Sequence, residues 1–339
     1  MPRLGGQPIS RRDLMARVGR IEQIGGVRRV RLAEGPGAGV ELAEFRTGTG
    51  FDFAVALSRG MDIPEASWRG QSLCWHGAPG LAAPQAYDPE GLEWLRLFYG
   101  GLLTTCGLSY AGAPCEDGGA KLGLHGRYTS LVAEGTSVEG HWEGDDYVMT
   151  ARGRMREAKV FFEKLVLTRT ISAKLGEPRL RIEDVVENEG HAPAEHMILY
   201  HCNFGYPLLS EQTRLVAPSR ERKAVVPGTA VADWDRFLPP TGGFAERVYY
   251  HAMDPAADGT VTVRLENAAN GMKAYLAYDA KALPRFIQWK MCGEGEYVLG
   301  LEPANCGVEG RAKERERGTL QVLQPGESRR YTLELGVEA

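Results

Sequence analysis

Three ionisable side chains lie in stretches that are otherwise apolar or rich in glycine. His201 lies in "LYHCNFGYPLL", Glu302 in "EYVLGLEPANCG" and His125 in "LGLHGRYTS". Removing a carboxyl group from water raises its pKa toward neutrality, the range that suits a general base. The sequence therefore offers two imidazoles and a carboxyl group for acid–base chemistry. Structural roles are also open, because a buried histidine is often a satisfied core group and Glu302 could pair with a buried arginine.

The glycines near His125 raise the question of whether its imidazole faces a ligand. Gly123 and Gly126 lie close to it on either side. Glycine carries no side chain that would shield an imidazole, and it allows backbone conformations closed to other residues. We therefore expect His125 either to face a ligand or to lie in a simple turn. His76, which is followed by Gly77, shares part of this pattern.

The surroundings of His201 and Glu302 suit a sugar. Strand alternation sends His201 and Asn203 to the same face. Trp75 and Trp289 offer aromatic faces for the CH groups of a sugar ring, while amides, arginines and carboxylates bind hydroxyl groups. Exchange of sugar anomers needs one group that protonates the ring oxygen and another that takes the anomeric hydroxyl proton. Each such group contributes about 10²- to 10⁴-fold to the rate, and no cofactor is required.

Several other classes of function lack support in the composition and motifs. The 339 residues carry a formal net charge of −4, which argues against a basic nucleic-acid surface. No stretch approaches the roughly 18 to 20 apolar residues of a membrane span, and the N-terminal residues show no secretory apolar region. There is no GxGxxG, P-loop or HExxH motif, and "GLSYAG" around Ser109 only loosely resembles a nucleophile elbow. The six cysteines form no CxxC pair, so we expect reduced thiols and a cytoplasmic enzyme.

Alternating apolar residues predict strands along most of the chain. Phe51, Phe53 and Val55 share one side of such a segment, and the strand that carries Glu302 is expected to end before Pro303. Many strands without alternating helices predict an all-β fold built from antiparallel strands. We expect one continuous domain over residues 1–339.

Few helices are expected. The best signal lies in residues 88–100, where Leu92, Leu95 and Phe98 would form one apolar stripe. The charged run at 311–318 is predicted to be a solvated turn.

The quoted motifs resemble the aldose 1-epimerase (galactose mutarotase-like) superfamily, and more closely its DUF4432 branch. The resemblance implies the antiparallel β supersandwich of that superfamily, whose open cleft binds a sugar. It covers most of the chain, through "LSRGMDI" (57–63), "YGGLLTTCGL" (99–108), "GLHGR" (123–127), "LYHCNFGYPLL" (199–209) and "QWKMCGEGEYVLGLEPANCG" (288–307).

The resemblance also implies roles for individual residues. His125 would contact the sugar near its ring oxygen, His201 would be the acid on that oxygen, and Glu302 would be the base on the anomeric hydroxyl. Further candidates for substrate binding are Arg59, Arg127, Asn203, Trp289 and His76.

Two family residues have no clear counterpart here. Relatives carry an arginine ahead of the HG motif, whereas "YGGLLTTCGL" contains none, and Arg59 is one candidate for its place. Asp62, beside Arg59, could equally form a structural ion pair. The family aspartate between the second histidine and the glutamate could be Asp233, Asp235 or Asp254.

Three functions remain open from the sequence. The first is an isomerase of the aldose 1-epimerase type that interconverts α and β anomers of an aldose or modified sugar. The second is a catalytically silent carbohydrate-binding protein. The third is an isomerase or lyase for an oxidised or acidic sugar, whose charge Arg59 and Arg127 could bind. A metal bound by His125, His201 and Glu302 would fit this third case.

The expected partners follow from these readings. We predict a small-molecule sugar substrate, no cofactor, no metal, no nucleic acid and no membrane. A homodimer could form through an uncovered sheet edge.

Overall fold

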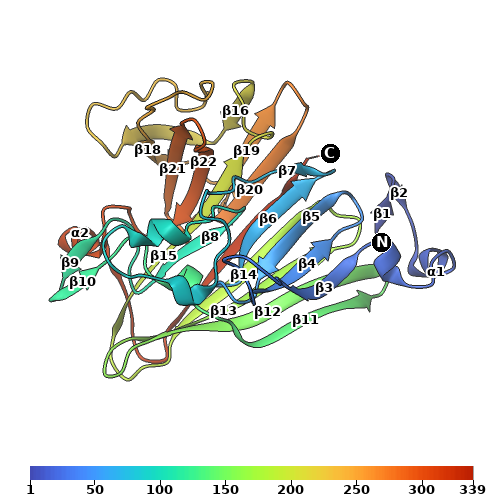
Figure 1. Cartoon of the computed structure of the whole chain (residues 1–339), viewed down its shortest axis with the longest axis horizontal. Coiled ribbons are helices and arrows are strands. Elements are labelled where there is room, and N and C mark those ends of the chain that lie inside the picture. The colour runs from blue at the N-terminus through green and yellow to red at the C-terminus, as the bar shows by residue number, and fades with distance from the viewer. Residues whose placement is uncertain (339) are drawn as a thin grey trace.

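The computed structural model describes residues 1–338, and three antiparallel sheets make up most of it (Figure 1). The eight-stranded sheet has the order β11 (Glu134–Glu143), β12 (Asp146–Ala158), β13 (Lys164–Lys174), β14 (Arg179–Asn188), β24 (Ser328–Val337), β20 (Lys273–Asp279), β19 (Thr260–Asn267) and β16 (Thr213–Val216). The seven-stranded sheet has the order β17 (Ser219–Ala224), β18 (Arg247–Met253), β21 (Arg285–Cys292), β22 (Tyr297–Ala304), β15 (Ala194–Gly205) and β23 (Gln321–Leu323), with β8 (Thr104–Leu108) paired to β15. The five-stranded sheet consists of β3 (Gly26–Arg31), β4 (Glu41–Arg46), β5 (Phe51–Ala56), β6 (Asp62–Trp68) and β7 (Gln71–Ser72).

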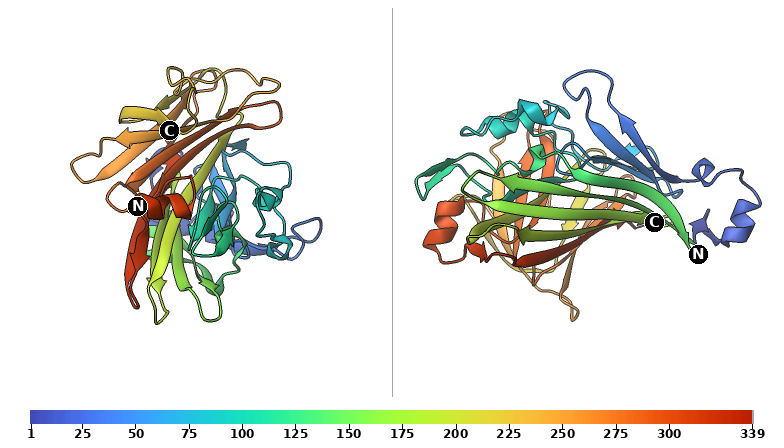
Figure 2. Two further views of the ribbon diagram at one scale, coloured as in Figure 1. Left: turned by 90° about the vertical axis from the view of Figure 1, so that its left-hand side faces the viewer. Right: turned by 90° about the horizontal axis from the view of Figure 1, so that it is seen from below.

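The remaining elements are short. Two small hairpins pair β1 (Arg3–Leu4) with β2 (Gln7–Pro8) and β9 (Cys115–Asp117) with β10 (Ala120–Leu122). The α-helices are α1 (Arg11–Met15) and α2 (Arg311–Glu316), at opposite ends of the long axis (Figures 1 and 2). The 3₁₀ turns are η1 (Ile21–Gln23), η2 (Pro84–Ala86), η3 (Glu93–Leu97) and η4 (Tyr128–Ser130). This architecture confirms the predicted all-β fold. Within residues 1–338, no helix has the length and apolar character needed to cross a membrane.

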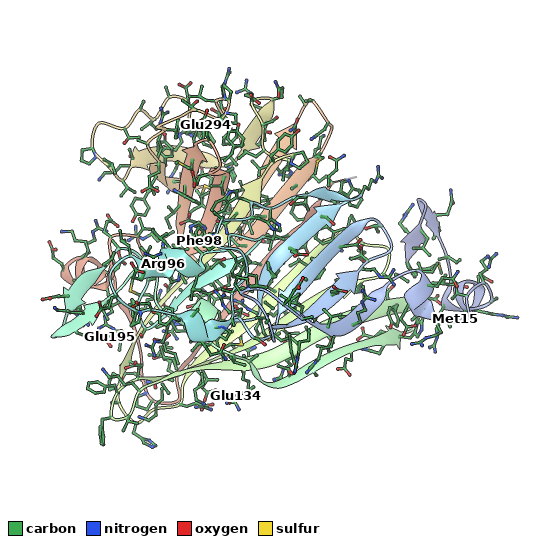
Figure 3. All side chains as sticks on the ribbon, in the orientation of Figure 1. Met15, Arg96, Phe98, Glu134, Glu195 and Glu294 are labelled. Carbon is green, nitrogen blue, oxygen red and sulfur yellow. The ribbon has the colours of Figure 1, made fainter. Side chains whose placement is uncertain are left out.

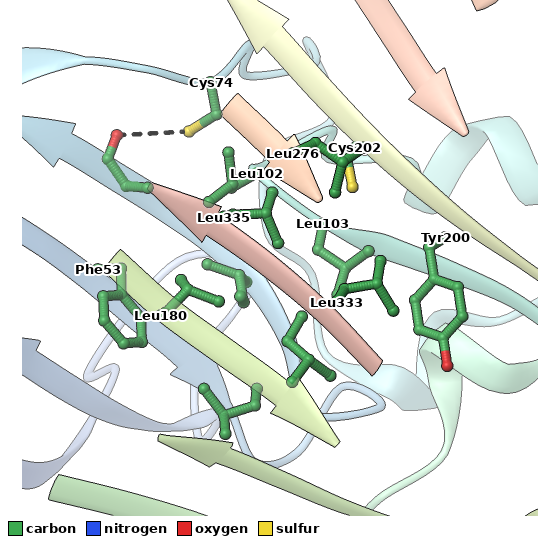
Figure 4. Packing of buried hydrophobic residues seen from close by; sticks show 14 of the residues in the cluster. Phe53, Cys74, Leu102, Leu103, Leu180, Tyr200, Cys202, Leu276, Leu333 and Leu335 are labelled. Carbon is green, nitrogen blue, oxygen red and sulfur yellow. Dashed lines mark hydrogen bonds between the residues drawn. The ribbon is translucent and has the colours of Figure 1, made fainter. Parts of the chain in front are cut away.

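The main hydrophobic core lies between the three large sheets. One cluster of buried side chains contains Phe53 of the five-stranded sheet, Leu333 and Leu335 of the eight-stranded sheet, and Cys202 of the seven-stranded sheet. Figure 4 shows part of this packing at close range, and Figure 2 shows β11 to β14 running side by side as one layer. Phe51, Phe53 and Val55 are buried as predicted, and Ala54 and Ala56 on the opposite side of β5 are buried too.

Strand β15 is buried on both faces, and this double burial positions the site. One face, with Ile198 and Tyr200, packs into the main core. The other, with Met197 and Leu199, joins a second, smaller cluster. His201 and Asn203 lie on that second face, because side chains alternate along the strand.

The segment predicted as a helix at 88–100 forms only the 3₁₀ turn η3. Trp94 and Leu97 are buried there, whereas Leu92 and Leu95 are 58% and 48% exposed. The predicted stripe is therefore wrong except for Phe98, which is buried. A 3₁₀ turn has three residues per turn, so it sends a different set of side chains inward from an α-helix.

Two other local predictions are wrong. The run at 311–318 contains helix α2, in which Glu314 is buried and Arg311 donates to Asp117 Oδ2 at 2.6 Å. Strand β22 does not stop before Pro303, because Pro303 lies opposite Phe286 on β21. Arg311 and Arg315 of α2 both pair with Asp117, a partner far away in the sequence that local composition does not show.

Candidate active site

Three residues that are far apart in the sequence meet on the second face of β15. His201 lies on β15 and Glu302 on the adjacent strand β22. The Nε2 atom of His201 is 3.2 Å from Oε1 of Glu302. The ring of His125, from the loop between β10 and η4, lies with its centroid 5.9 Å from that of His201 and nearly perpendicular to it. The structure thus brings together the two imidazoles and the carboxyl group that the sequence singled out.

Burial shifts the proton equilibria of all three groups. The side chains of His201 and Glu302 are only 6% and 3% exposed. Loss of hydration lowers the pKa of His201 to about 3, helped by the nearby His125, and lowers the pKa of His125 to about 4. The same loss of hydration raises the pKa of Glu302 to about 8, and the negative charge of Glu246 adds to the shift. Across neutral pH, the His201–Glu302 pair therefore holds a single proton.

No arginine neutralises Glu302. Among the ion pairs of residues 1–338, Glu302 contacts His201 and neither a lysine nor an arginine. The buried arginine pair considered from the sequence is therefore absent. His201 is not a satisfied core histidine either, because its Nδ1 atom is buried without a hydrogen-bond partner.

The glycines beside His125 serve close backbone packing rather than access to the imidazole. A Cβ atom on Gly126 would lie 2.4 Å from the carbonyl oxygen of Tyr110, and one on Gly123 would lie 2.2 Å from that of Pro89. His125 itself has a φ of 56°, and its N–H donates to the carbonyl of Gly112 at 2.9 Å. The tight backbone holds the histidine in a left-handed conformation that most side chains avoid.

Aromatic rings enclose the acid–base group. The rings of Phe98 and Trp289 lie 5.2 Å and 5.4 Å from that of His201, and Trp94 lies 4.8 Å from His125. Trp75 contacts both Phe98 and Trp289. Phe98, which is labelled in Figure 3, directly follows η3. Trp289 is fixed further by a 2.7 Å hydrogen bond from its Nε1 atom to Glu246.

Unpaired polar atoms gather in this site. Within residues 1–338, eight buried side-chain nitrogen or oxygen atoms have no hydrogen-bond partner, and five of them belong to Trp94, His125, His201, Asn203 and Glu302. Buried polar groups in folded proteins are nearly always paired, so such a concentration indicates a place where a polar ligand binds.

Gly300 leaves the space that the carboxyl group of Glu302 occupies. A Cβ atom there would lie 2.6 Å from Glu302 Oε1 and 3.1 Å from His201 Cε1. We expect Gly300→Ala to displace the acid–base pair and to slow any reaction that depends on this pair about 100-fold, the loss that a misplacement of about 1 Å causes. Steady-state kinetics would measure it. Gly19→Ala is the control, since a Cβ atom at Gly19 meets nothing within 4 Å; equal rates in both variants would contradict the expectation.

Three of the predicted substrate-binding residues, Arg59, His76 and Arg127, lie outside this group. Arg59 is fully buried and donates to the backbone carbonyls of Thr129 and Leu97 at 2.7 Å and 3.3 Å, and also to that of Ala82. Its guanidinium is thus used in joining loops and does not face a ligand, which corrects its predicted role. His76 is exposed, and its Nε2 atom lies 3.6 Å from Cys74 Sγ.

Arg127 is exposed, and its guanidinium lies 5.7 Å from the centroid of the Tyr87 ring. It has no ion-pair partner among the acidic groups of residues 1–338. The position leaves it free for a ligand, although no contact joins it to His201 or Glu302.

The candidate aspartates are also placed. Asp62 does not pair with Arg59 but with Arg169, at 3.0 Å, in the core. Asp235 forms an ion pair with Arg214, and Asp254 forms an exposed ion pair with Arg220; Asp233 is exposed. None of these aspartates contacts His125, His201 or Glu302. Residues 1–338 also contain no group of three or more His, Cys, Asp or Glu side chains arranged to hold a metal ion.

Sequence reasoning missed four residues of the site, namely Trp94, Phe98, Glu246 and Gly300. The tryptophan and phenylalanine lie in the segment mistaken for a helix, and the glycine interrupts an apolar strand two residues before Glu302. A glycine within a strand often marks a close approach, which was the available signal for Gly300. Nothing in the local sequence indicated Glu246.

Solved structures share this fold. A candidate aldose 1-epimerase from Klebsiella pneumoniae aligns with a TM-score of 0.83 and 23% identity, over 92% of this chain and 83% of that one. A galactose mutarotase-like protein from Clostridium acetobutylicum (TM-score 0.62) and a galactose 1-epimerase from Lactobacillus acidophilus (TM-score 0.61) each align at 12% identity, over 93% of this chain and 99% of theirs. No curated protein matches the sequence. The family model described as "Domain of unknown function (DUF4432)" matches residues 37–337, and the chain therefore belongs to the DUF4432 family.

Proposed function

We propose that this protein is an enzyme of the aldose 1-epimerase type, which interconverts the α and β anomers of a sugar. The observation that carries the proposal is the contact of 3.2 Å between His201 and Glu302, a buried pair that holds one proton across neutral pH. Anomer exchange requires an acid and a base at the same time, and a pair with a single proton supplies both.

The reaction would proceed by proton transfer at the two oxygens of the anomeric carbon. One member of the pair donates its proton to the ring oxygen, and the other removes the anomeric hydroxyl proton. The C1–O5 bond breaks to give the open-chain aldehyde, which rotates, and the ring closes with the two roles reversed. The pKa values place this proton on Glu302. The roles expected from the family, with His201 as acid and Glu302 as base, would require this proton to move to His201, whose Nε2 atom lies 3.2 Å away.

The aromatic rings and unpaired polar atoms support a sugar as substrate. Trp75 and Trp289 offer faces for CH groups, and the five unpaired atoms offer sites for hydroxyl groups. Phe98 and Trp289 both pack against His201, which is only 5% exposed.

The pH dependence of anomer exchange tests the proposal. As the pH rises through about 8, Glu302 loses the single proton of the pair, and no acid remains. We therefore expect kcat/KM to be flat from about pH 5 to 7 and to fall above about pH 8, as followed by polarimetry. A fall only below pH 5, with full activity at pH 9, would show that a different group carries the proton.

A catalytically silent sugar-binding protein is the second candidate. It is favoured by the buried position of Arg59, which leaves the family arginine without a replacement at the site. Calorimetry that detects saccharide binding, together with anomer exchange at the buffer rate, would support this candidate over the enzyme.

A further inference from the structure

The unpaired atoms define which ligand the site can recognise. We infer that the site takes an uncharged sugar, and that the indole N–H of Trp94 and the side-chain carbonyl of Asn203 are two fixed recognition groups for its hydroxyls. This inference rests on the proposed function for the nature of the ligand. It assigns to Trp94 a role that the sequence did not suggest.

Asn203 presents an acceptor in one orientation. The side chain is completely buried, and its Nδ2 atom donates to the carbonyls of Gly100 and His201 at 3.2 Å and 2.9 Å. These two bonds fix the amide, so its Oδ1 atom is left without a partner. A ligand must bring a hydrogen-bond donor to this atom.

Trp94 presents a donor in the same site. Only 3% of the residue is exposed, and its ring packs at 4.7 Å against Phe98 and at 4.8 Å against His125. The indole nitrogen is buried without a partner and can only donate. A ligand must therefore bring an acceptor here. A hydroxyl group can donate and accept, so a polyhydroxylated ligand satisfies both Trp94 and Asn203.

The charges around the site disfavour an anion. The guanidinium of Arg59 is engaged by backbone carbonyls, and the Nζ atom of Lys290 is engaged by those of Asp233 and Arg236. Across the described part of the chain, no lysine or arginine forms an ion pair with Glu302, and the carboxylate of Glu246 lies at the neighbouring Trp289. A phosphate or carboxylate placed here would lose its hydration without gaining a cation. The third hypothesis from the sequence was an acidic sugar bound by Arg59 and Arg127. Because Arg59 is engaged by backbone carbonyls, binding of such a sugar would depend on Arg127 alone.

A matched panel of sugars tests the ligand class. Anomer exchange and calorimetric binding would be measured with full-length protein for glucose, galactose and mannose, and for their 6-phosphates and uronates. We expect at least one neutral sugar to bind and exchange, and its charged counterparts to show kcat/KM lower by roughly 100-fold, the scale of a buried unpaired polar group.

The outcomes separate this inference from the proposed function. Exchange confined to phosphates or uronates would overturn the inference and retain the function. Binding of a neutral sugar without exchange would retain the inference and overturn the function. Absence of both binding and exchange for every sugar would overturn both.

A tryptophan substitution tests the recognition group itself. Trp94→Phe keeps an aromatic ring against Phe98 and removes the N–H, so we expect about a tenfold rise in the dissociation constant of the best neutral sugar. Trp142→Phe, on strand β11, is the control and should bind like wild type. Unchanged affinity in a folded Trp94→Phe protein, as judged by circular dichroism, would overturn the role of Trp94.

Discussion

Glu302→Gln should lower the rate of anomer exchange by about 10²- to 10⁴-fold, because an amide can neither donate nor accept the transferred proton. The substitution preserves the size of the side chain, and Glu302 Oε1 has no hydrogen bond to lose. Exchange would be followed by polarimetry at pH 7. A variant that retains more than about a tenth of the wild-type rate would remove Glu302 from the mechanism.

The same substitution should make the protein more stable at high pH. Burial gives Glu302 a pKa of about 8 in the folded protein, above the ordinary value of about 4.3 in the unfolded chain. Between these two values the unfolded chain releases the proton while the folded protein keeps it, so the free energy of unfolding falls as the pH rises. Glu302→Gln removes this fall, and urea unfolding at pH 9 should show the variant to be more stable than wild type.

Glu157 provides a matched control, since it is also a buried glutamate but its carboxylate is satisfied. It accepts hydrogen bonds from the backbone N–H groups of Leu108 and Ser109 at 2.7 Å and 3.3 Å. Glu157→Gln should therefore cost about 1–3 kcal/mol of stability. Opposite signs for the two substitutions would identify Glu302 as a residue kept for function. Equal losses would indicate that Glu302 is structural.

A buried ion-pair network around Arg169 should contribute strongly to the stability of the fold. Arg169 is fully buried and binds Asp184 at 2.7 Å and Asp62 at 3.0 Å, and Tyr200 also donates to Asp184. Arg169→Leu leaves two carboxylates buried without a cation, so we expect a loss of about 3–5 kcal/mol in the free energy of unfolding. Chemical denaturation at pH 7 would measure this loss.

An exposed ion pair gives the contrast for Arg169. Arg220 and Asp254 pair at 2.8 Å with side chains that are 65% and 56% exposed. Arg220→Leu should change stability by at most about 1 kcal/mol, because water screens such pairs. If Arg169→Leu were equally mild, the buried network would not be a major contributor to the stability of the fold.

The sequence was most informative where an ionisable side chain lies in an otherwise apolar strand, because burial of such a group is unfavourable unless it has a role. His201 and Glu302 stand out because polar side chains interrupt strands that are apolar on both faces, and those strands prove to be adjacent. The period-two pattern also predicted the all-β fold, and burial follows it closely in β14, whereas β5 is buried on both faces.

What could not be predicted depends on contacts between distant residues. Arg59 looked available for a substrate, but loops that pass over it supply three carbonyl acceptors. Phe98 and Trp94 reach the site through a 3₁₀ turn, whose side-chain directions the helical pattern misjudged. The glycines at 123 and 126 pack against backbone from other segments, a constraint that only the fold shows.

Magnetisation transfer between the α and β anomeric proton signals of free sugars measures most directly whether the protein catalyses anomer exchange. With catalytic amounts of wild-type protein at pH 7, we predict exchange well above the buffer rate for at least one neutral aldose. Exchange at the buffer rate for every aldose, from protein that binds one of them in calorimetry, would contradict it.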